Sequence, residues 1–313
     1  MSSSPTISEE TMYVKKLGVY YGITAYALYP SQSTLEDLHG LELQSYVSSL
    51  ADWLAKGILS SQSLFKILTS AEPLLSPEIR SGTGLKGWMS SLPARILDDF
   101  MICRTRAYYT AHPELFKSRR IVDMEESEKR GEVFIRRYFI PKIRKLVDKA
   151  VEKNYKHEIL KLEDCNKENK KYYLIYKGLE KEIACKPDMV AIISFYGKFL
   201  RTLVFEVAET DTHTVLRRKH VIPRILLYII ATYLHYGIPS VGFYISLSPK
   251  SSPPTIVFIP KGGKQQKGTT RIRKLIQILE DIRNLVLATD VPKPNRNPIC
   301  SHCVYRPICK FAM

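Results

Sequence analysis

The chain has 313 residues, of which 45% are hydrophobic, and its 47 basic and 31 acidic side chains give a formal net charge of +16. This length can bury one large core, or one core with a smaller lobe. No run approaches the roughly 20 apolar residues of a membrane span, and the N-terminus lacks the charged and apolar regions of a signal peptide. We therefore expect a cytoplasmic protein without a membrane partner. The positive charge favours nucleic acid as the partner, with a generally basic surface as the alternative.

The predicted elements begin with several short helices between about residues 20 and 91. Apolar residues recur near the helical period from Leu41 to Leu54, Gly57 is a plausible stop, and the pattern restarts over residues 61–68. No catalytic pattern occurs in this stretch. We predict a helical N-terminal lobe over residues 1–91.

The middle of the chain alternates helices with strands. We predict helices over residues 92–109, 127–152 with a kink or break at Pro141, 223–236 and 269–288. We predict strands over residues 171–176, 183–195, 199–207, 240–247 and 255–259, with a hairpin turn at Tyr196-Gly197. This order predicts an α/β core with a mixed central sheet flanked by helices over residues 92–290.

Four of the six cysteines carry the strongest signal in the chain. Cys300, Cys303 and Cys309 have a C-x2-C-x5-C spacing, and Cys103 can supply a fourth thiolate from upstream. Four thiolates suit a structural zinc or an iron–sulfur cluster, and the spacing does not separate the two. His302 could replace one thiolate at zinc, and unligated thiols are the remaining alternative. We predict that residues 291–313 form a cysteine segment that packs with Cys103.

Two acids lie at the ends of the second and third predicted strands. Asp188 follows Lys186-Pro187, and Glu206 lies in the apolar run LVFEVA. A hairpin can bring the two carboxylates to one edge of the sheet, where such a pair holds Mg²⁺ or Mn²⁺. The alternative is that each acid sits at a strand end and faces water.

With these elements in order, the chain resembles the CRISPR-associated RecB-type, or PD-(D/E)xK, iron–sulfur exonucleases of the spacer-acquisition machinery. The resemblance covers about residues 92–313. It is carried by FMICRTRAYY around Cys103, by the strands KPDMVAI and VFEVAET, by the helix RILLYIIATYL and by the closing CSHCVYRPIC.

The resemblance implies a PD-(D/E)xK core, a 4Fe–4S cluster on the four cysteines and Mg²⁺ or Mn²⁺ on Asp188 and Glu206. It implies an antiviral deoxyribonuclease of CRISPR adaptation, exonucleolytic on single strands. DNA strands or ends are the expected partner, adaptation proteins are implied by the resemblance, and self-association is left open. Tyr228 matches the tyrosine of the family's Q-x-x-x-Y helix. We expect DNA contacts from five arginines, namely Arg104, Arg106, Arg217, Arg218 and Arg224, some of them beside tyrosines that can stack on unpaired bases.

Three departures weaken the catalytic pattern. Ala208 stands at the lysine of E-x-K, Arg224 at the glutamine of the helix, and no histidine occurs near Ile135. A migrated base, Lys219 or Arg217 or Arg218, could replace the lysine, and Glu209, His213 or Glu132 could supply a metal ligand. The departures support a second hypothesis, a catalytically impaired nuclease-fold subunit that binds DNA or scaffolds an adaptation or repair complex. A zinc-stapled nucleic-acid-binding protein is the third.

Overall fold

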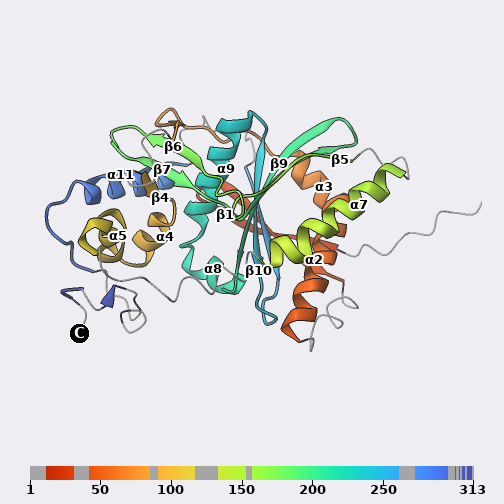
Figure 1. Ribbon diagram of the computed structural model, residues 1–313, viewed down its shortest axis with the longest axis horizontal. Helices are drawn as coiled ribbons and strands as arrows, with labels where there is room; N and C mark the ends of the chain where they lie inside the picture. The colour runs from red at the N-terminus through yellow and green to blue at the C-terminus, as the bar shows by residue number, and fades with distance from the viewer. Residues whose placement is uncertain are drawn as a thin grey trace, which may run out of the picture.

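The computed structural model describes residues 12–31, 42–84, 91–116, 133–152, 157–260 and 272–294, together with residues 300, 303, 305, 306 and 309–311. It has a seven-stranded sheet and a four-stranded sheet, with helices packed around both (Figure 1). This architecture confirms the α/β class and the mixed central sheet. None of the helices in the described ranges combines the length and apolar character needed to cross a bilayer.

The seven-stranded sheet has the order β1-β2-β11-β10-β9-β8-β5. Only β9 and β10 run parallel, and all other neighbours in this sheet are antiparallel. A parallel pair needs a crossover connection, which here consists of α8 (Thr212–Arg218) and α9 (Ile222–Tyr236). The strands are β1 (Met12–Tyr20), β2 (Ile23–Pro30), β5 (Glu158–Asp164), β8 (Met189–Phe195), β9 (Phe199–Ala208), β10 (Ser240–Ser246) and β11 (Thr255–Ile259).

The smaller sheet has the order β3-β6-β7-β4, in which β4 and β7 are parallel. Its strands are β3 (Ile79–Ser81), β4 (Ser91–Pro93), β6 (Tyr172–Tyr176) and β7 (Glu182–Cys185). The strands β6 and β7 also contact α9. The helix α9 is thereby covered by both sheets, which explains its nearly continuous apolar sequence.

Side chains on the central strands alternate between two cores, as the two-residue period of a strand requires. Met189 and Phe205 face a core with α2 (Leu43–Ser60), α3 (Gln62–Thr69), the π-helical turn η3 (Phe134–Phe139) and α7 (Ile140–Glu152). Val190 and Val204 face a second core with α9, α4 (Ile96–Ile102), α5 (Arg104–Ala111) and α11 (Arg273–Val286). A short 3₁₀ turn, η2 (Pro113–Phe116), follows α5.

Several predicted elements are confirmed. The hairpin turn at Tyr196-Gly197 joins β8 to β9, with positive φ at both residues. The helix α9 begins with Pro223 in its first turn and ends at Gly237, whose φ of 68° suits glycine. The strands β6, β9, β10 and β11 and the helix α11 lie within a few residues of their expected ranges.

Other predictions were wrong. Residues 12–30 are not helical but form a β-hairpin that extends the central sheet, so the expected helical lobe is limited to α2 and α3. The single strand expected over 183–195 is two strands in two sheets, because the chain turns at Pro187. The helix expected around Cys103 is broken at that residue, which is extended with φ −161° and ψ 123°.

The charged helix expected from residue 127 is described only from residue 133. It begins as the π-helical turn η3 and continues as α7. Pro141 does not end the helix, but the change from π-helical to α-helical geometry falls directly before it, between Phe139 and Ile140.

Candidate acidic centre and cysteine pocket

The register between β8 and β9 brings Asp188 and Glu206 together. Met189 pairs with Phe205, and the Asp188 N–H donates to the Phe205 carbonyl at 3.0 Å. Glu206 follows Phe205, so the alternation turns it toward α9, and it is 8% exposed. The two acids of the sequence prediction are therefore neighbours at one end of the hairpin.

Arg224, in the first turn of α9, forms ion pairs with two carboxylates. Its Nη2 lies 2.8 Å from Glu206 Oε1, and its Nε lies 3.0 Å from Asp98 Oδ2 on α4. The exposed fractions of the Arg224, Asp98 and Glu206 side chains are 18%, 14% and 10%. The acidic centre thus contains its own cation. The predicted contact of Arg224 with DNA stays a prediction, and sequence reasoning missed Asp98.

Burial and neighbouring charges both shift the pKa values of these groups. Burial alone would lower the pKa of Arg224, but Asp98 and Glu206 raise it well above its ordinary value, so the guanidinium stays charged. Burial raises the pKa of Asp98 to about 7, although Arg224 opposes that shift. Burial and the nearby Glu206 also raise the pKa of Tyr228, which is therefore a neutral phenol beside the ion pairs.

The Asp188 carboxylate is tied to the protein through both oxygens. Oδ1 accepts a hydrogen bond from Asn166 Nδ2 at 2.8 Å, and Oδ2 accepts one from the Val207 N–H at 2.7 Å. These bonds hold the carboxylate against the strand ends. A carboxylate has about four lone-pair sites, so the bonds reduce its capacity for a metal but do not abolish it.

The candidate replacement groups lie on α8 and at its end. Lys219 ends α8 with a φ of 57°, and its Nζ lies 5.7 Å from the Tyr20 ring centroid. Among the described residues no ion pair joins Lys219 to Asp188 or Glu206. Arg217 and Arg218 are exposed in the last turn of α8, as is His213 at its start.

Further candidates are on the other side of the sheet. Glu209 lines a hollow with residues of α2 and η3. Ile135, where the family's histidine would fall, is buried in the core of that same side. Glu132 lies outside the described residues. Across the described ranges, no three histidine, cysteine or acidic side chains are arranged as ligands of one metal ion.

All four predicted cysteines line one small pocket. Cys103, at the junction of α4 and α5, faces it together with Cys300, Cys303 and Cys309. Burial raises the pKa of the Cys303 thiol, and the nearby Cys103 and Cys309 thiols add to the shift. Thiols are the donor type that structural zinc and iron–sulfur clusters use, although these four are not arranged here as ligands of one ion.

Contacts outside the thiols hold the C-terminal segment to this pocket. Thr105 Oγ1 donates to the Pro292 carbonyl at 2.7 Å. The Tyr305 ring packs against Tyr109 with centroids 5.6 Å apart, and its hydroxyl lies 3.0 Å from Thr110 Oγ1. His302 lies outside the described residues.

The helix α4 joins the acidic centre to the cysteine pocket through two consecutive aspartates. Asp98 binds Arg224, whereas Asp99 binds Arg106 Nε at 2.5 Å and Thr110 Oγ1 at 2.6 Å. Arg106 therefore forms an internal ion pair, and its predicted contact with DNA stays a prediction. Arg104 is exposed, with its guanidinium carbon 5.7 Å from the Phe100 ring centroid.

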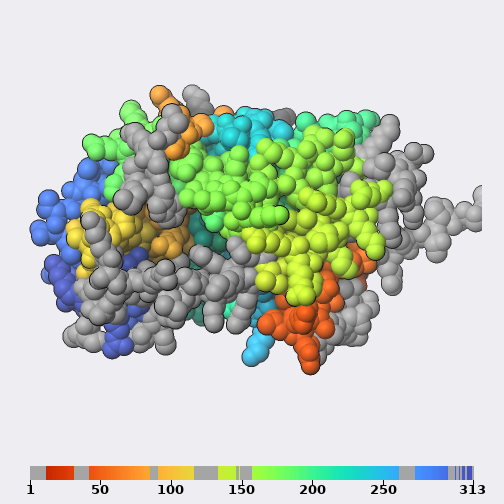
Figure 2. Space-filling model, in the orientation of Figure 1, coloured from red at the N-terminus to blue at the C-terminus, as the bar shows by residue number. Residues whose placement is uncertain are grey.

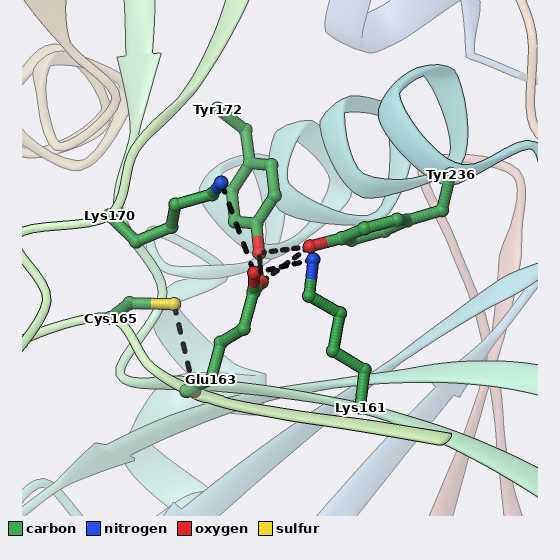
Figure 3. Close-up of polar contacts among 6 residues, drawn as sticks. All are labelled: Lys161, Glu163, Cys165, Lys170, Tyr172 and Tyr236. Carbon is green, nitrogen blue, oxygen red and sulfur yellow. Dashed lines mark hydrogen bonds and ion pairs between the residues drawn. The ribbon is translucent and has the colours of Figure 1, made fainter.

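A third polar cluster, around Glu163 on β5, had no counterpart in the sequence analysis (Figure 3). Tyr236 donates to Glu163 Oε2 at 2.5 Å, Tyr172 donates to the same oxygen, and Lys161 Nζ lies 2.9 Å from Oε1. Burial would raise the pKa of Glu163, but the bonds from the tyrosines and Lys161 hold it below its ordinary value. Since Tyr172 belongs to β6 and Tyr236 ends α9, the cluster ties both sheets to α9.

Comparison with known proteins gave no match among family models, curated sequences or solved structures. The family resemblance therefore rests on the motifs of this chain alone.

Proposed function

We propose that this chain is a nucleic-acid-binding protein on a nuclease-like α/β core, in which Arg224 rather than a divalent ion neutralises the acidic centre. The observation that carries the proposal is the pair of contacts from Arg224 to Glu206 and Asp98. This corresponds to the catalytically impaired alternative among the sequence hypotheses.

An arginine in this place cannot do the work of a metal. A bound Mg²⁺ polarises a phosphoryl oxygen and lowers the pKa of bound water, whereas a guanidinium offers only fixed N–H donors. For Glu206 to bind a metal, Arg224 would have to leave, and a buried charge without its partner is costly. The lysine that supports attack in the nucleases that this chain resembles is also absent, because its position at the end of β9 is occupied by Ala208.

Binding of a polyanion is supported by charge. The net charge is +16, and Arg104, Arg217 and Arg218 are exposed. Arg106 and Arg224 instead form ion pairs with acids of the chain. Exposed cations contact phosphates and release counterions, so such binding weakens with salt.

The cysteine pocket has a structural role in this proposal. Cys103, Cys300, Cys303 and Cys309 would hold a 4Fe–4S cluster or zinc, which when bound supplies a crosslink between α4, α5 and the C-terminal segment. The adjacent contacts of Tyr305 with Tyr109 and Thr110 orient that segment.

A second candidate is the metal-dependent deoxyribonuclease of CRISPR adaptation. The adjacency of Asp188 and Glu206 at the hairpin end favours it, as does Asp98, a third carboxyl nearby. In that case Arg224 would have to move when Mg²⁺ or Mn²⁺ binds the acids, and Tyr228 would line the site.

One pair of assays separates the two candidates. Binding of labelled single-stranded and duplex DNA is measured by fluorescence anisotropy across salt concentrations, and cleavage is measured with Mn²⁺, with Mg²⁺ and with EDTA. We expect binding that falls with salt, and no cleavage. Metal-dependent cleavage that Asp188→Ala abolishes would establish the nuclease instead, and absence of binding at low salt would overturn both.

A further inference from the structure

A hollow of about 690 Å³ lies on the face of the central sheet opposite the acidic centre. Glu209 directly follows β9, and Leu247, Ser248 and Pro249 directly follow β10, so the hollow sits where the two parallel strands end. Ligands of open α/β sheets bind outside the carboxyl ends of parallel strands, and ligand pockets span about 300–1,000 Å³. Its place and size are therefore those of a ligand site.

Hydrogen bonds fix the strand ends that form one wall. The Leu247 N–H donates to the Ala208 carbonyl at 2.8 Å, which joins the end of β10 to the end of β9. Tyr46 on α2 donates its hydroxyl to the Ser248 carbonyl at 3.2 Å, and Figure 1 shows α2 beside this end of β10. The wall is thus organised before a ligand arrives, which lowers the cost of binding.

Apolar side chains make up half of the described lining. Among them Leu43 and Val133 are 48% and 46% exposed, on α2 and just before η3. Apolar surface in a concave site is covered favourably by a flat apolar group. The remaining lining is polar and comes from Gln44, Arg137, Tyr138, Glu209 and Ser248.

We propose that this hollow binds one unpaired nucleotide. Tyr138 offers an aromatic ring, on which bases stack. The next residue toward the N-terminus, Arg137, is exposed and offers a guanidinium, which matches a phosphate. A ring that stacks on a base and a guanidinium that binds a phosphate are the groups expected where a basic protein holds the end of a nucleic-acid single strand. The site is separate from the acidic centre and does not depend on it.

Glu209 sets the preferred base. A carboxylate only accepts hydrogen bonds, so it selects a base edge that donates. Guanine presents two adjacent donors, N1–H and the N2 amino group, which match the two carboxylate oxygens, whereas cytosine has a single amino group. Adenine likewise has a single amino group, and uracil a single N3–H, so we expect guanosine 5′-monophosphate to bind most tightly and the cytidine, adenosine and uridine monophosphates more weakly.

Isothermal titration calorimetry of the full chain tests the site with these four nucleotides, guanosine and inorganic phosphate. Glu209→Gln is expected to weaken GMP binding about tenfold and to erase the preference for GMP over AMP. Arg137→Ala is expected to weaken GMP about tenfold but guanosine hardly at all. The matched controls Glu158→Gln, on the far edge strand β5, and Arg80→Ala, on β3, leave both affinities unchanged.

The outcomes separate this inference from the proposed function. Saturable binding of GMP that follows this ranking supports the site. No saturable binding of any nucleotide, or binding that the Glu209 and Arg137 variants leave unchanged, overturns it. DNA binding without GMP binding rejects the hollow and keeps the proposed function, whereas GMP binding without DNA binding does the reverse.

Discussion

The acidic centre and the cysteine pocket both adjoin α4, but they differ in whether an arginine of the chain pairs with the groups that line them. In the acidic centre, Arg224 supplies a positive charge to Glu206 and Asp98 from within the chain. In the cysteine pocket, Arg106 lines the wall but is held by Asp99, and four thiols face the same space. The difference teaches that the first centre contains a cation of its own, whereas the second gathers four thiols around one pocket.

The largest expected effect comes from a substitution in the cysteine pocket. Cys303→Ser should remove bound metal and lower the free energy of unfolding by several kcal/mol, since binding at a structural metal site is also folding free energy. Metal analysis and thermal unfolding on anaerobically purified protein measure this. Cys165→Ala is the control, because Cys165 is buried away from the pocket and should leave metal content unchanged. Undiminished metal in the Cys303 variant would contradict the assignment of the pocket.

The next largest effect comes from a substitution in the acidic centre. Arg224→Ala leaves Glu206 and Asp98 buried without their cation and should cost about 3–5 kcal/mol in denaturant unfolding. Arg136→Ala removes a more exposed arginine, 2.7 Å from Asp164, and should cost about 1 kcal/mol or less. Equal costs for the two variants would mean that Arg224 is not the counter-ion of a buried centre.

A third experiment makes the acidic centre resemble the cysteine pocket by removing its internal cation. Arg224→Gln combined with Ala208→Lys restores two of the three missing residues of the family pattern and leaves Asp188, Glu206 and Asp98 for an added ion. We expect Mn²⁺ at a hundredfold its dissociation constant to stabilise this variant by about 2.7 kcal/mol and the wild type not at all. Stabilisation of both proteins by the same amount would show that Arg224 does not exclude the metal.

The smallest expected effect concerns the Glu163 cluster, whose carboxylate is neutralised internally like the acidic centre. The pKa of Glu163 lies below its ordinary value of 4.5, so its contribution is present above that value and is lost as the pH falls below it. Glu163→Gln should cost about 2 kcal/mol at pH 7, and the difference from wild type should shrink on acidification. The control Glu158→Gln changes an exposed residue of the same strand, and its free energy of unfolding should stay within about 0.5 kcal/mol of wild type both at pH 7 and at acidic pH. A difference independent of pH would exclude a charged Glu163.

The central hairpin and α9 could be predicted because their signals are local. Tyr196-Gly197 marks the turn, and Pro223 and Gly237 bound the helix. The same dipeptide, Tyr21-Gly22, has positive φ at both residues and joins β1 to β2. It could have revealed the N-terminal hairpin, but β2 is buried on both faces and lacks the alternation that identifies a strand.

The rest of the candidate site could not be predicted, because it depends on contacts between distant segments. Asp98 carries no motif and becomes a partner of Arg224 only when α4 packs on α9. The break at Cys103 has neither glycine nor proline to announce it. Arg224 was recognised as a departure from the family pattern, yet its role as counter-ion follows only from the geometry.

The pairing of β2 with β11 has a consequence for how the molecule is made. These neighbours in the sheet come from opposite ends of the chain, with Leu28 opposite Thr255. During synthesis the hairpin of β1 and β2 emerges before β11, so its apolar strand β2 has no partner on its inner edge until β11 has been translated. Such distant pairing is slow and exposes unpaired strand edges in the meantime. The hairpin of β1 and β2 thus leaves the ribosome long before the strand that secures it in the sheet.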